Sequence, residues 1–209
     1  MQKVYEKLRS DITFGKFRPG DRLSEKLLTE EYNCSRASVR EVIRQLASQG
    51  YLSFVPNRGV TVTKLSVEDI NATYRILSRC ESLAASMTAK KAQKGLVKRL
   101  RNCHDEMITY SNDYRKWLPI NDQFHELIYI NCGCSFLIDL IHNFRLRIYR
   151  YRAVETKKKV IPVYNEHHQK LILSIENKDE KLAEESMINH LNHARKNRFE
   201  VFRKFENLF

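Results

Sequence analysis

Residues 35–62 read SRASVREVIRQLASQGYLSFVPNRGVTV, and the spacing of apolar residues in this run changes from helical to alternating at Gly50. Before Gly50 the apolar positions recur every three or four residues, at Val39, Val42, Ile43, Leu46 and Ala47. With Ser35 as its N-cap, this segment predicts a helix that buries one face. After Gly50, apolar residues alternate on both sides of the turn-forming run PNRG at 56–59, which predicts a two-stranded hairpin.

Two further helices are predicted on the N-terminal side of this run. The first has apolar residues at helical spacing, at Val4, Tyr5, Leu8 and Ile12. Gly15 is expected to end it. The second is expected to begin after Ser24, a suitable N-cap, and to end near Tyr32, so that only a tight turn separates it from the helix after Ser35. Three helices, the last two joined by a tight turn, followed by a hairpin, indicate a winged helix-turn-helix.

The face of the third helix opposite its apolar stripe carries three arginines. Arg36, Arg40 and Arg44 follow one another at intervals of four residues, so their guanidinium groups share one ridge. A helix of this width fits the DNA major groove, where arginine donates two hydrogen bonds to a guanine edge or contacts phosphate. The alternative is a solvated face whose charge Glu41 offsets. The preceding turn and the following hairpin favour DNA binding.

From residue 66 to the end, the pattern is helical. Breaks near 94–95, Pro119, 131–135, Pro162 and 177–178 divide this part into six or seven helices with no convincing strand. The predicted fold class is therefore mainly α. We expect a winged helix-turn-helix over residues 1–65 and an all-helical bundle over residues 66–209.

Composition narrows the classes of function. The 209 residues have a net charge of +12, which favours nucleic acid as a partner, although both predicted domains are basic. There is neither an apolar run long enough for a membrane span nor a secretory signal, so a cytoplasmic protein that does not contact membranes is expected. The five cysteines form no repeated CxxC pairs and are expected to be reduced thiols.

Several motifs resemble a known family. The runs GKFRPGDRL at 15–23 and SRASVREV at 35–42 are similar to the GntR family of bacterial transcription factors. The segments NDQFH at 121–125, EHH at 166–168 and MINHL at 187–191 resemble its FadR subgroup, which has an all-helical FCD effector domain.

This resemblance implies a homodimeric repressor or activator that binds a palindromic double-stranded operator and responds to a small-molecule effector. It places DNA contacts at Lys26, Ser35, Arg36, Arg40, Arg58 and Gly59. The arginines of the third helix would contact base edges, whereas Ser35 and Lys26 would hold phosphates. Gly59 would let the hairpin backbone approach the minor groove. Arg44 joins this set through the ridge that it shares with Arg36 and Arg40.

The resemblance also implies a metal site, formed in many FCD domains by one Asp and three His. The matching positions are Asn121, His125, His168 and His190. Asn121 and His125 share a helix face, and His168 and His190 lie at similar heights on two helices joined near 177–178. Three imidazoles suit Zn²⁺, Ni²⁺, Mn²⁺ or Fe²⁺. The alternative is a hydrated polar pocket without metal.

Two departures from the family pattern concern ligand chemistry. Asn121 stands where the family carboxylate falls, so this set of residues has no negative charge. Leu77 occupies the position of an arginine that pairs with carboxylate effectors in many members, and the nearby Arg75 and Arg79 are expected to point elsewhere.

Two other functions remain open at this level. The first is a metal-dependent hydrolase with an accessory nucleic-acid-binding domain, because three His with an open coordination position resemble a catalytic zinc centre. No carboxylate is placed as a general base beside the histidines, and GxSxG, P-loop and HExxH motifs are missing. The second is an architectural DNA-binding protein whose bundle serves only to dimerise. The sequence favours a regulator that senses a metabolite.

Overall fold

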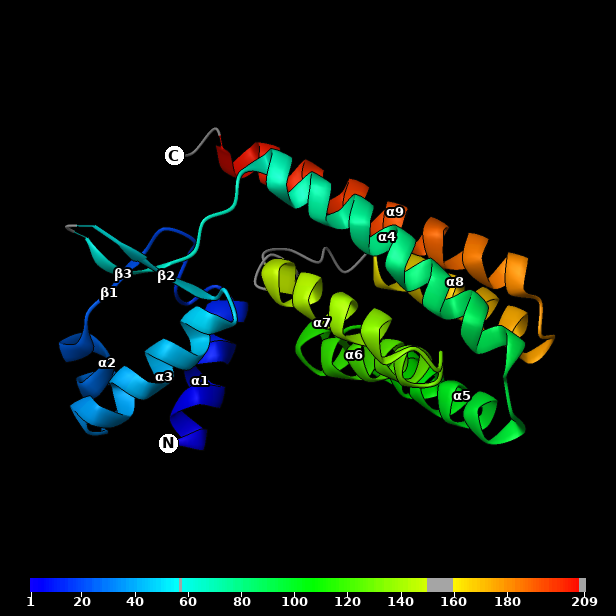
Figure 1. Ribbon diagram of the computed structural model, residues 1–209, viewed down its shortest axis with the longest axis horizontal. Coiled ribbons are helices and arrows are strands. Elements are labelled where there is room, and N and C mark those ends of the chain that lie inside the picture. The colour runs from blue at the N-terminus through cyan, green and yellow to red at the C-terminus, as the bar shows by residue number, and fades with distance from the viewer. Residues whose placement is uncertain (57, 150–159, 207–209) are drawn as a thin grey trace. The chain divides into compact units, whose positions relative to one another are not determined.

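The computed structural model describes residues 1–56, 58–149 and 160–206 (Figure 1). The chain divides into two compact units. One contains Met1–Ile70 and the end of helix α7 (Ser135–Tyr149) from Asn143 onward. The other contains Asn71–His142 with helices α8 (Ile161–Glu176) and α9 (Glu180–Glu206).

The described part of residues 1–65 contains three helices and a small antiparallel sheet, as expected for a winged helix-turn-helix. The helices are α1 (Gln2–Thr13), α2 (Glu25–Tyr32) and α3 (Arg36–Ser48). The strands are β1 (Arg22–Leu23), β2 (Leu52–Val55) and β3 (Gly59–Val62), in the order β1-β3-β2. The β2–β3 hairpin pairs Leu52 with Val62 and Val55 with Gly59. The sequence predicted only these two strands, and β1 adds a third.

Local capping chemistry sets the boundaries of the second and third helices. The Ser24 hydroxyl accepts a hydrogen bond from the Leu27 amide, and the Ser35 hydroxyl accepts one from the Ser38 amide. Between them Asn33 has a left-handed backbone, with φ of 46°, which ends α2 and starts the tight turn. Both predicted N-caps are thus confirmed.

The core of the first unit fixes the orientation of α3. Val39, Val42, Ile43 and Leu46 are buried together with residues of α1, α2 and the hairpin. Each buried aliphatic side chain of this kind contributes about 1.5–3 kcal/mol. Turning α3 about its axis would expose this stripe, so its opposite, arginine-bearing face stays in solvent.

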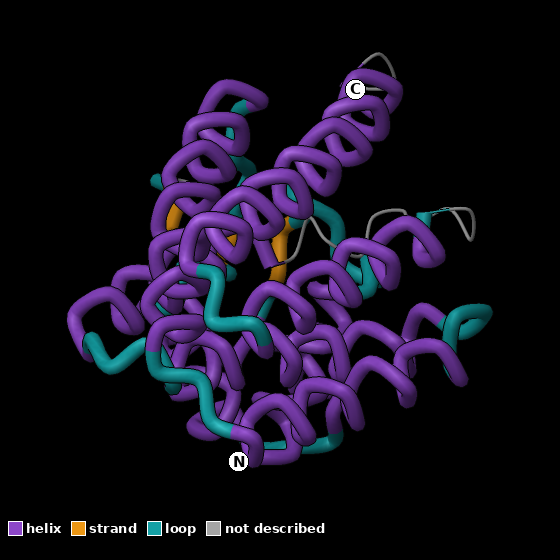
Figure 2. The backbone as a smooth tube through the Cα atoms, turned by 90° about the vertical axis from the view of Figure 1, so that its right-hand side faces the viewer, coloured by secondary structure: helices purple, strands orange, loops and turns teal. Residues whose placement is uncertain are grey.

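The described chain after residue 65 contains six helices, within the predicted six or seven. They are α4 (Val67–Lys90), α5 (Lys94–Thr109), α6 (Tyr114–Ile130), α7 (Ser135–Tyr149), α8 (Ile161–Glu176) and α9 (Glu180–Glu206). Most of their residues belong to the second unit, whereas α4 begins and α7 ends within the first. In Figure 2 the strands are confined to short orange segments, and in the described chain after residue 65 there is no strand.

One predicted helix break is wrong. Pro119 lies inside α6 rather than at its end. It is the sixth residue of the helix, so its missing N–H removes one hydrogen bond close to the N-terminal end, and the helix continues through it. Asp113 supports this end, because its side chain accepts hydrogen bonds from the Arg115 and Lys116 amides.

Polar contacts between helices hold the bundle together. Helix α4 lies along α9 (Figure 1), with Lys90 paired to Glu180 at 3.6 Å and Arg195 donating to Asn71 at 3.1 Å near the other end. The Thr88 hydroxyl donates to the Ile128 carbonyl at 2.7 Å and so connects α4 to α6. Helix α5 packs against both α6 and α8. No helix in the described part of the chain has the length and hydropathy needed to cross a membrane.

Candidate functional site

The arginines of α3 lie on the solvent face, as the sequence predicts. Arg36, Arg40 and Arg44 are all exposed, with 58% of the Arg40 side chain and 68% of the Arg44 side chain accessible. Arg40 donates from Nε to Glu25 at 2.7 Å, and Arg44 donates from Nη1 to Glu41 at 3.0 Å. The face is therefore positive, but two of its guanidinium groups already have carboxylate partners.

The Arg40–Glu25 pair links α3 to α2. The hydrogen bond from Arg40 lowers the pKa of Glu25 below its ordinary value, and the charge of Arg36 acts in the same direction. The same contact raises the pKa of Arg40. Because both side chains are in water, a phosphate or a base edge can take the place of Glu25 at little cost.

The remaining predicted DNA positions are also at the surface. Lys26 is exposed on α2, with Glu30 at 4.0 Å, and Ser35 is exposed at the start of α3. Arg58 and Gly59 are exposed at the tip of the β2–β3 hairpin. Gly59 has φ of +76°, and no atom of the described residues would contact a Cβ placed there. The backbone conformation therefore explains the glycine.

The hairpin carries one exposed aromatic residue, Phe54, which belongs to the alternating apolar pattern that predicts the strands. Phe54 faces Val60 across the two strands, yet 65% of its surface is accessible. It shares a strand face with the buried Leu52 but lies beyond the edge of the core. Alternation identifies the face of a strand residue, whereas its exposure depends on how far the core extends.

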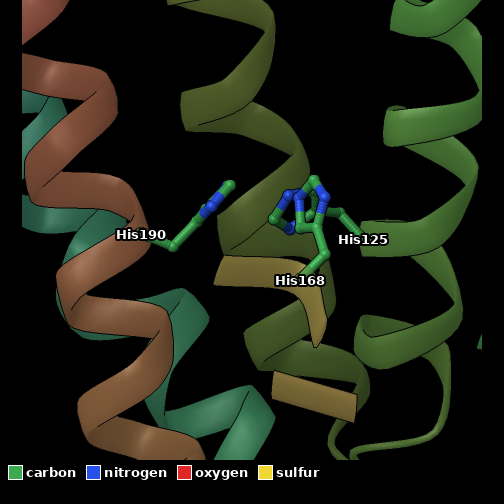
Figure 3. A group of neighbouring side chains, drawn as sticks. All are labelled: His125, His168 and His190. Carbon is green, nitrogen blue, oxygen red and sulfur yellow. The ribbon is translucent and has the colours of Figure 1, made fainter. Parts of the chain in front are cut away.

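Three histidines meet in the helical bundle. His125 comes from α6, His168 from α8 and His190 from α9, and their rings point toward one another (Figure 3). The candidate ligand atoms all lie within 4.8 Å of one another. Ring centroids are 5.4 Å apart for His125 and His168, 5.0 Å for His125 and His190, and 4.6 Å for His168 and His190. The three side chains are 2%, 0% and 5% exposed, respectively.

Helices α8 and α9 form a helical hairpin that brings His168 and His190 together. Its turn has a left-handed Lys178 with φ of 57°, and the Asp179 side chain accepts a hydrogen bond from the Leu182 amide at the start of α9. His168 and His190 lie at comparable heights above this turn, as the count along the helices predicts.

Aromatic side chains surround His125, His168 and His190, which we call the histidine trio. The Trp117 ring stacks on that of His168 with centroids 6.1 Å apart, and Phe124 lies 4.7 Å from the same imidazole. Trp117 is itself held in place, because its indole N–H donates to the Asn165 side chain at 3.1 Å. Buried rings packed in this way restrict the imidazoles to one arrangement.

Asn121 is buried on α6, one turn before His125, so it keeps the helix face that the sequence predicts. The other departure from the family pattern also has a structural counterpart. Leu77 is buried on α4, whereas Arg75 and Arg79 are exposed.

A buried carboxylate near the trio was missed by sequence reasoning. Glu81 on α4 is 1% exposed and accepts a hydrogen bond from the Tyr129 hydroxyl at 2.5 Å. The same carboxylate oxygen, Oε2, lies 3.8 Å from Nδ1 of His125. A signal was present in the sequence, because Glu81 falls on the apolar stripe that Leu77 and Ala85 share at helical spacing.

Two further histidines border the trio. The His167 and His193 rings are 5.3 Å apart, and the His167 ring is 5.9 Å from that of His190. Burial lowers the pKa of His167, and the charge of His193 lowers it further. Both residues are partly buried. His142, by contrast, pairs with Glu126 at 2.9 Å away from the trio.

Comparison with known proteins gives a consistent result. Residues 1–62 match the family described as "Bacterial regulatory proteins, gntR family", and residues 72–193 match the FCD domain. The chain is 27% identical to the HTH-type transcriptional repressor RspR of Escherichia coli K12 over 193 residues, covering 91% of this chain and 85% of RspR. It is 25% identical to the HTH-type transcriptional regulator YdhC of Bacillus subtilis over 202 residues, covering 91% and 87%.

Solved structures agree with the fold. The Escherichia coli McbR/YncC structure superposes with a TM-score of 0.80 at 19% identity, covering 98% of this chain and 97% of that one. The family and these relatives are described as regulators of transcription, which excludes the hydrolase weighed from the sequence. The chain belongs to the GntR family of bacterial transcriptional regulators and has the C-terminal FCD domain of its FadR-like members.

Proposed function

We propose that this regulator binds a palindromic operator as a homodimer, through residues 1–65, and that residues 66–209 dimerise and bind a metabolite. The observation that carries the proposal is the exposed arginine face of α3 beside the hairpin wing. One winged helix buries too little surface for specific regulation, so operator affinity requires two copies. The name of RspR favours repression, and the DNA target implies a cytoplasmic location.

Some of the DNA-binding side chains would contact base edges, and others would contact the DNA backbone. Arg36 and Arg40 project from the first turns of α3 and would donate to base edges in the major groove, with Arg44 further along the same ridge. Ser35 and Lys26 would contact phosphates that flank the groove. Arg58 and Gly59 would enter the adjacent minor groove from the wing.

Glu25 would compete with DNA for Arg40. It holds Arg40 at 2.7 Å before DNA arrives, so Arg40 must exchange one acceptor for another. A guanine edge offers two acceptors to the guanidinium in exchange for one carboxylate contact. A phosphate can also accept two hydrogen bonds from a guanidinium, so Glu25 would compete with both specific and random DNA for Arg40.

The histidine trio would hold a divalent ion. Three imidazoles within 4.8 Å of one another, buried and from three helices, match the donor set of Zn²⁺, Ni²⁺, Mn²⁺ or Fe²⁺. His125, His168 and His190 would be ligands, with the Asn121 amide oxygen beside them. When bound, the ion would supply a positive charge that favours an effector with oxygen donors. Burial of Leu77 at the usual arginine position argues for an effector whose recognition does not depend on that arginine.

The effector would act by favouring one placement of the two DNA-binding domains over another. By reciprocity, operator binding must then change effector affinity by the same factor. The buried trio distinguishes this proposal from an architectural protein, because a bundle that only dimerises has no need for three converging imidazoles.

The test is operator binding by Arg40→Ala. An operator selected by the wild-type protein from a randomised duplex pool is used as the probe. We expect Arg40→Ala to lower specific affinity by more than about tenfold and to leave thermal stability unchanged, because Arg40 is exposed and outside the core. Arg79→Ala, which removes an exposed arginine of α4, is the matched control and should bind as wild type. Equal binding by Arg40→Ala and wild type would contradict the proposal.

A further inference from the structure

The buried carboxylate of Glu81 needs a physical explanation. A charged carboxylate inside a protein is strongly destabilising unless hydrogen bonds or opposite charge compensate it. The Tyr129 hydroxyl donates one hydrogen bond to Oε2 of Glu81. The same oxygen faces Nδ1 of His125 at 3.8 Å, so the carboxylate lies directly behind one ring of the trio.

The histidine trio, in contrast, lacks negative charge. Three neutral imidazoles and the Asn121 amide carry no charge, so a divalent ion would bring two positive charges into a region where the three rings are at most 5% exposed. A carboxylate beside the ligands stabilises such an ion substantially, because charges interact strongly at short range in a protein interior. Glu81 brings that negative charge from another helix.

The geometry places Glu81 behind a ligand rather than among the ligands. Within the described chain, the group of candidate ligand atoms that lie within 4.8 Å of one another comprises the three histidines and does not include Glu81. A histidine that binds a metal through one nitrogen commonly donates its other N–H to a carboxylate, which fixes the tautomer and the ring orientation. Nδ1 of His125 is the nitrogen that faces Glu81.

We propose that Glu81 is a positioning residue of the metal site, which accepts a hydrogen bond from Nδ1–H of His125 and replaces the negative charge that Asn121 lacks. The present separation of 3.8 Å is longer than a hydrogen bond, so the ring and the carboxylate approach one another when the ion binds. Tyr129 holds the carboxylate in place. This inference rests on the metal site described under Proposed function.

The test compares zinc affinity among variants of the full-length, chelator-treated protein by calorimetric titration with Zn²⁺. Glu81→Gln keeps the shape and the acceptor for Tyr129 but removes the charge, and should weaken zinc binding about 10- to 100-fold. Adding Asn121→Asp to this variant returns a carboxylate to the site and should restore most of the loss. The matched control is Glu126→Gln, because Glu126 adjoins His125 in sequence but pairs with His142.

The melting temperature of the metal-free protein separates this role from a structural one. Glu81→Gln should not lower this melting temperature, because the substitution removes a buried charge. The substitution should, however, diminish the rise in melting temperature on adding zinc. A Glu81→Gln variant that loses stability without zinc but binds zinc as wild type does would overturn the inference. Histidine ¹⁵N spectra of the zinc-loaded wild type provide a readout that needs no variant: we expect His125 protonated at Nδ1, and zinc on Nδ1 would contradict the proposal.

The failure of this inference can be told apart from failure of the metal site. Zinc binding by wild type with unchanged affinity in Glu81→Gln overturns only the role of Glu81. Failure of the wild type to bind Zn²⁺ overturns the metal site and this role together. Operator binding, measured on the same samples, reports separately on the DNA-binding function.

Discussion

Zinc should stabilise the chelator-treated protein by an amount that can be stated in advance. A ligand that binds only the folded state at 100 times its dissociation constant adds about 2.7 kcal/mol. For a chain of this size, each kcal/mol raises the melting temperature by about 2–4 °C, so the expected shift is about 5–11 °C. His168→Ala should abolish this shift, because His168 is fully buried and belongs to the trio.

Truncating a buried ring also leaves a cavity, so His168→Ala should melt at a lower temperature even without metal. His104→Ala is the control for that effect, because His104 is buried and contacts the Asn165 carbonyl at 3.0 Å but does not belong to the trio. Both variants should be destabilised without zinc, and only His104→Ala should keep the zinc-dependent shift. Differential scanning calorimetry with and without Zn²⁺ measures both quantities. An undiminished shift in His168→Ala would refute the assignment of the ligands.

Three further predictions follow from particular contacts. Glu25→Gln should increase affinity for random duplex DNA at low salt, because Arg40 loses its carboxylate partner. Fluorescence anisotropy measures this affinity, and an unchanged value would show that the Arg40–Glu25 pair does not compete with DNA. Gly59→Ala should lower the free energy of unfolding, measured in urea, by about 1–2 kcal/mol, because a φ of +76° is strained for alanine. A smaller loss would show that the backbone of the hairpin adjusts to the substitution. The free energy of unfolding should fall as pH drops below 6.5, because burial lowers the pKa of His167 and the unfolded chain then binds the extra proton. In urea unfolding from pH 7 to 5, this free energy should decline less steeply for His167→Gln than for wild type, and equal declines would contradict this cause.

Local chemistry explains why much of the fold was predictable. Ser24 and Ser35 cap their helices through hydrogen bonds that reach only three residues along the chain. The apolar stripe of α3 likewise depends on spacing alone, and it fixed which face carries the arginines. His168 and His190 were predictable as neighbours because a single turn joins their helices.

Features that depend on distant parts of the chain were missed or wrong. Strand β1 has only two residues, and its existence depends on pairing with β3, nearly forty residues later. Glu81 shows no local sign of its partners, because its closeness to His125 and Tyr129 is set by the packing of α4 on α6. The error at Pro119 is local instead: the sequence predicts a helix break there, but the hydrogen bond that proline removes lies close to the end of α6 that Asp113 caps.

The most direct test of DNA reading by α3 is the base preference of each operator position for wild type and Arg40→Ala, measured by sequencing duplexes retained from a randomised pool. We expect Arg40→Ala to lose preference at one position in each half-site, symmetrically about the operator centre, while the other positions keep theirs. A preference profile identical to that of wild type would contradict the assignment of α3 as the helix that reads the bases.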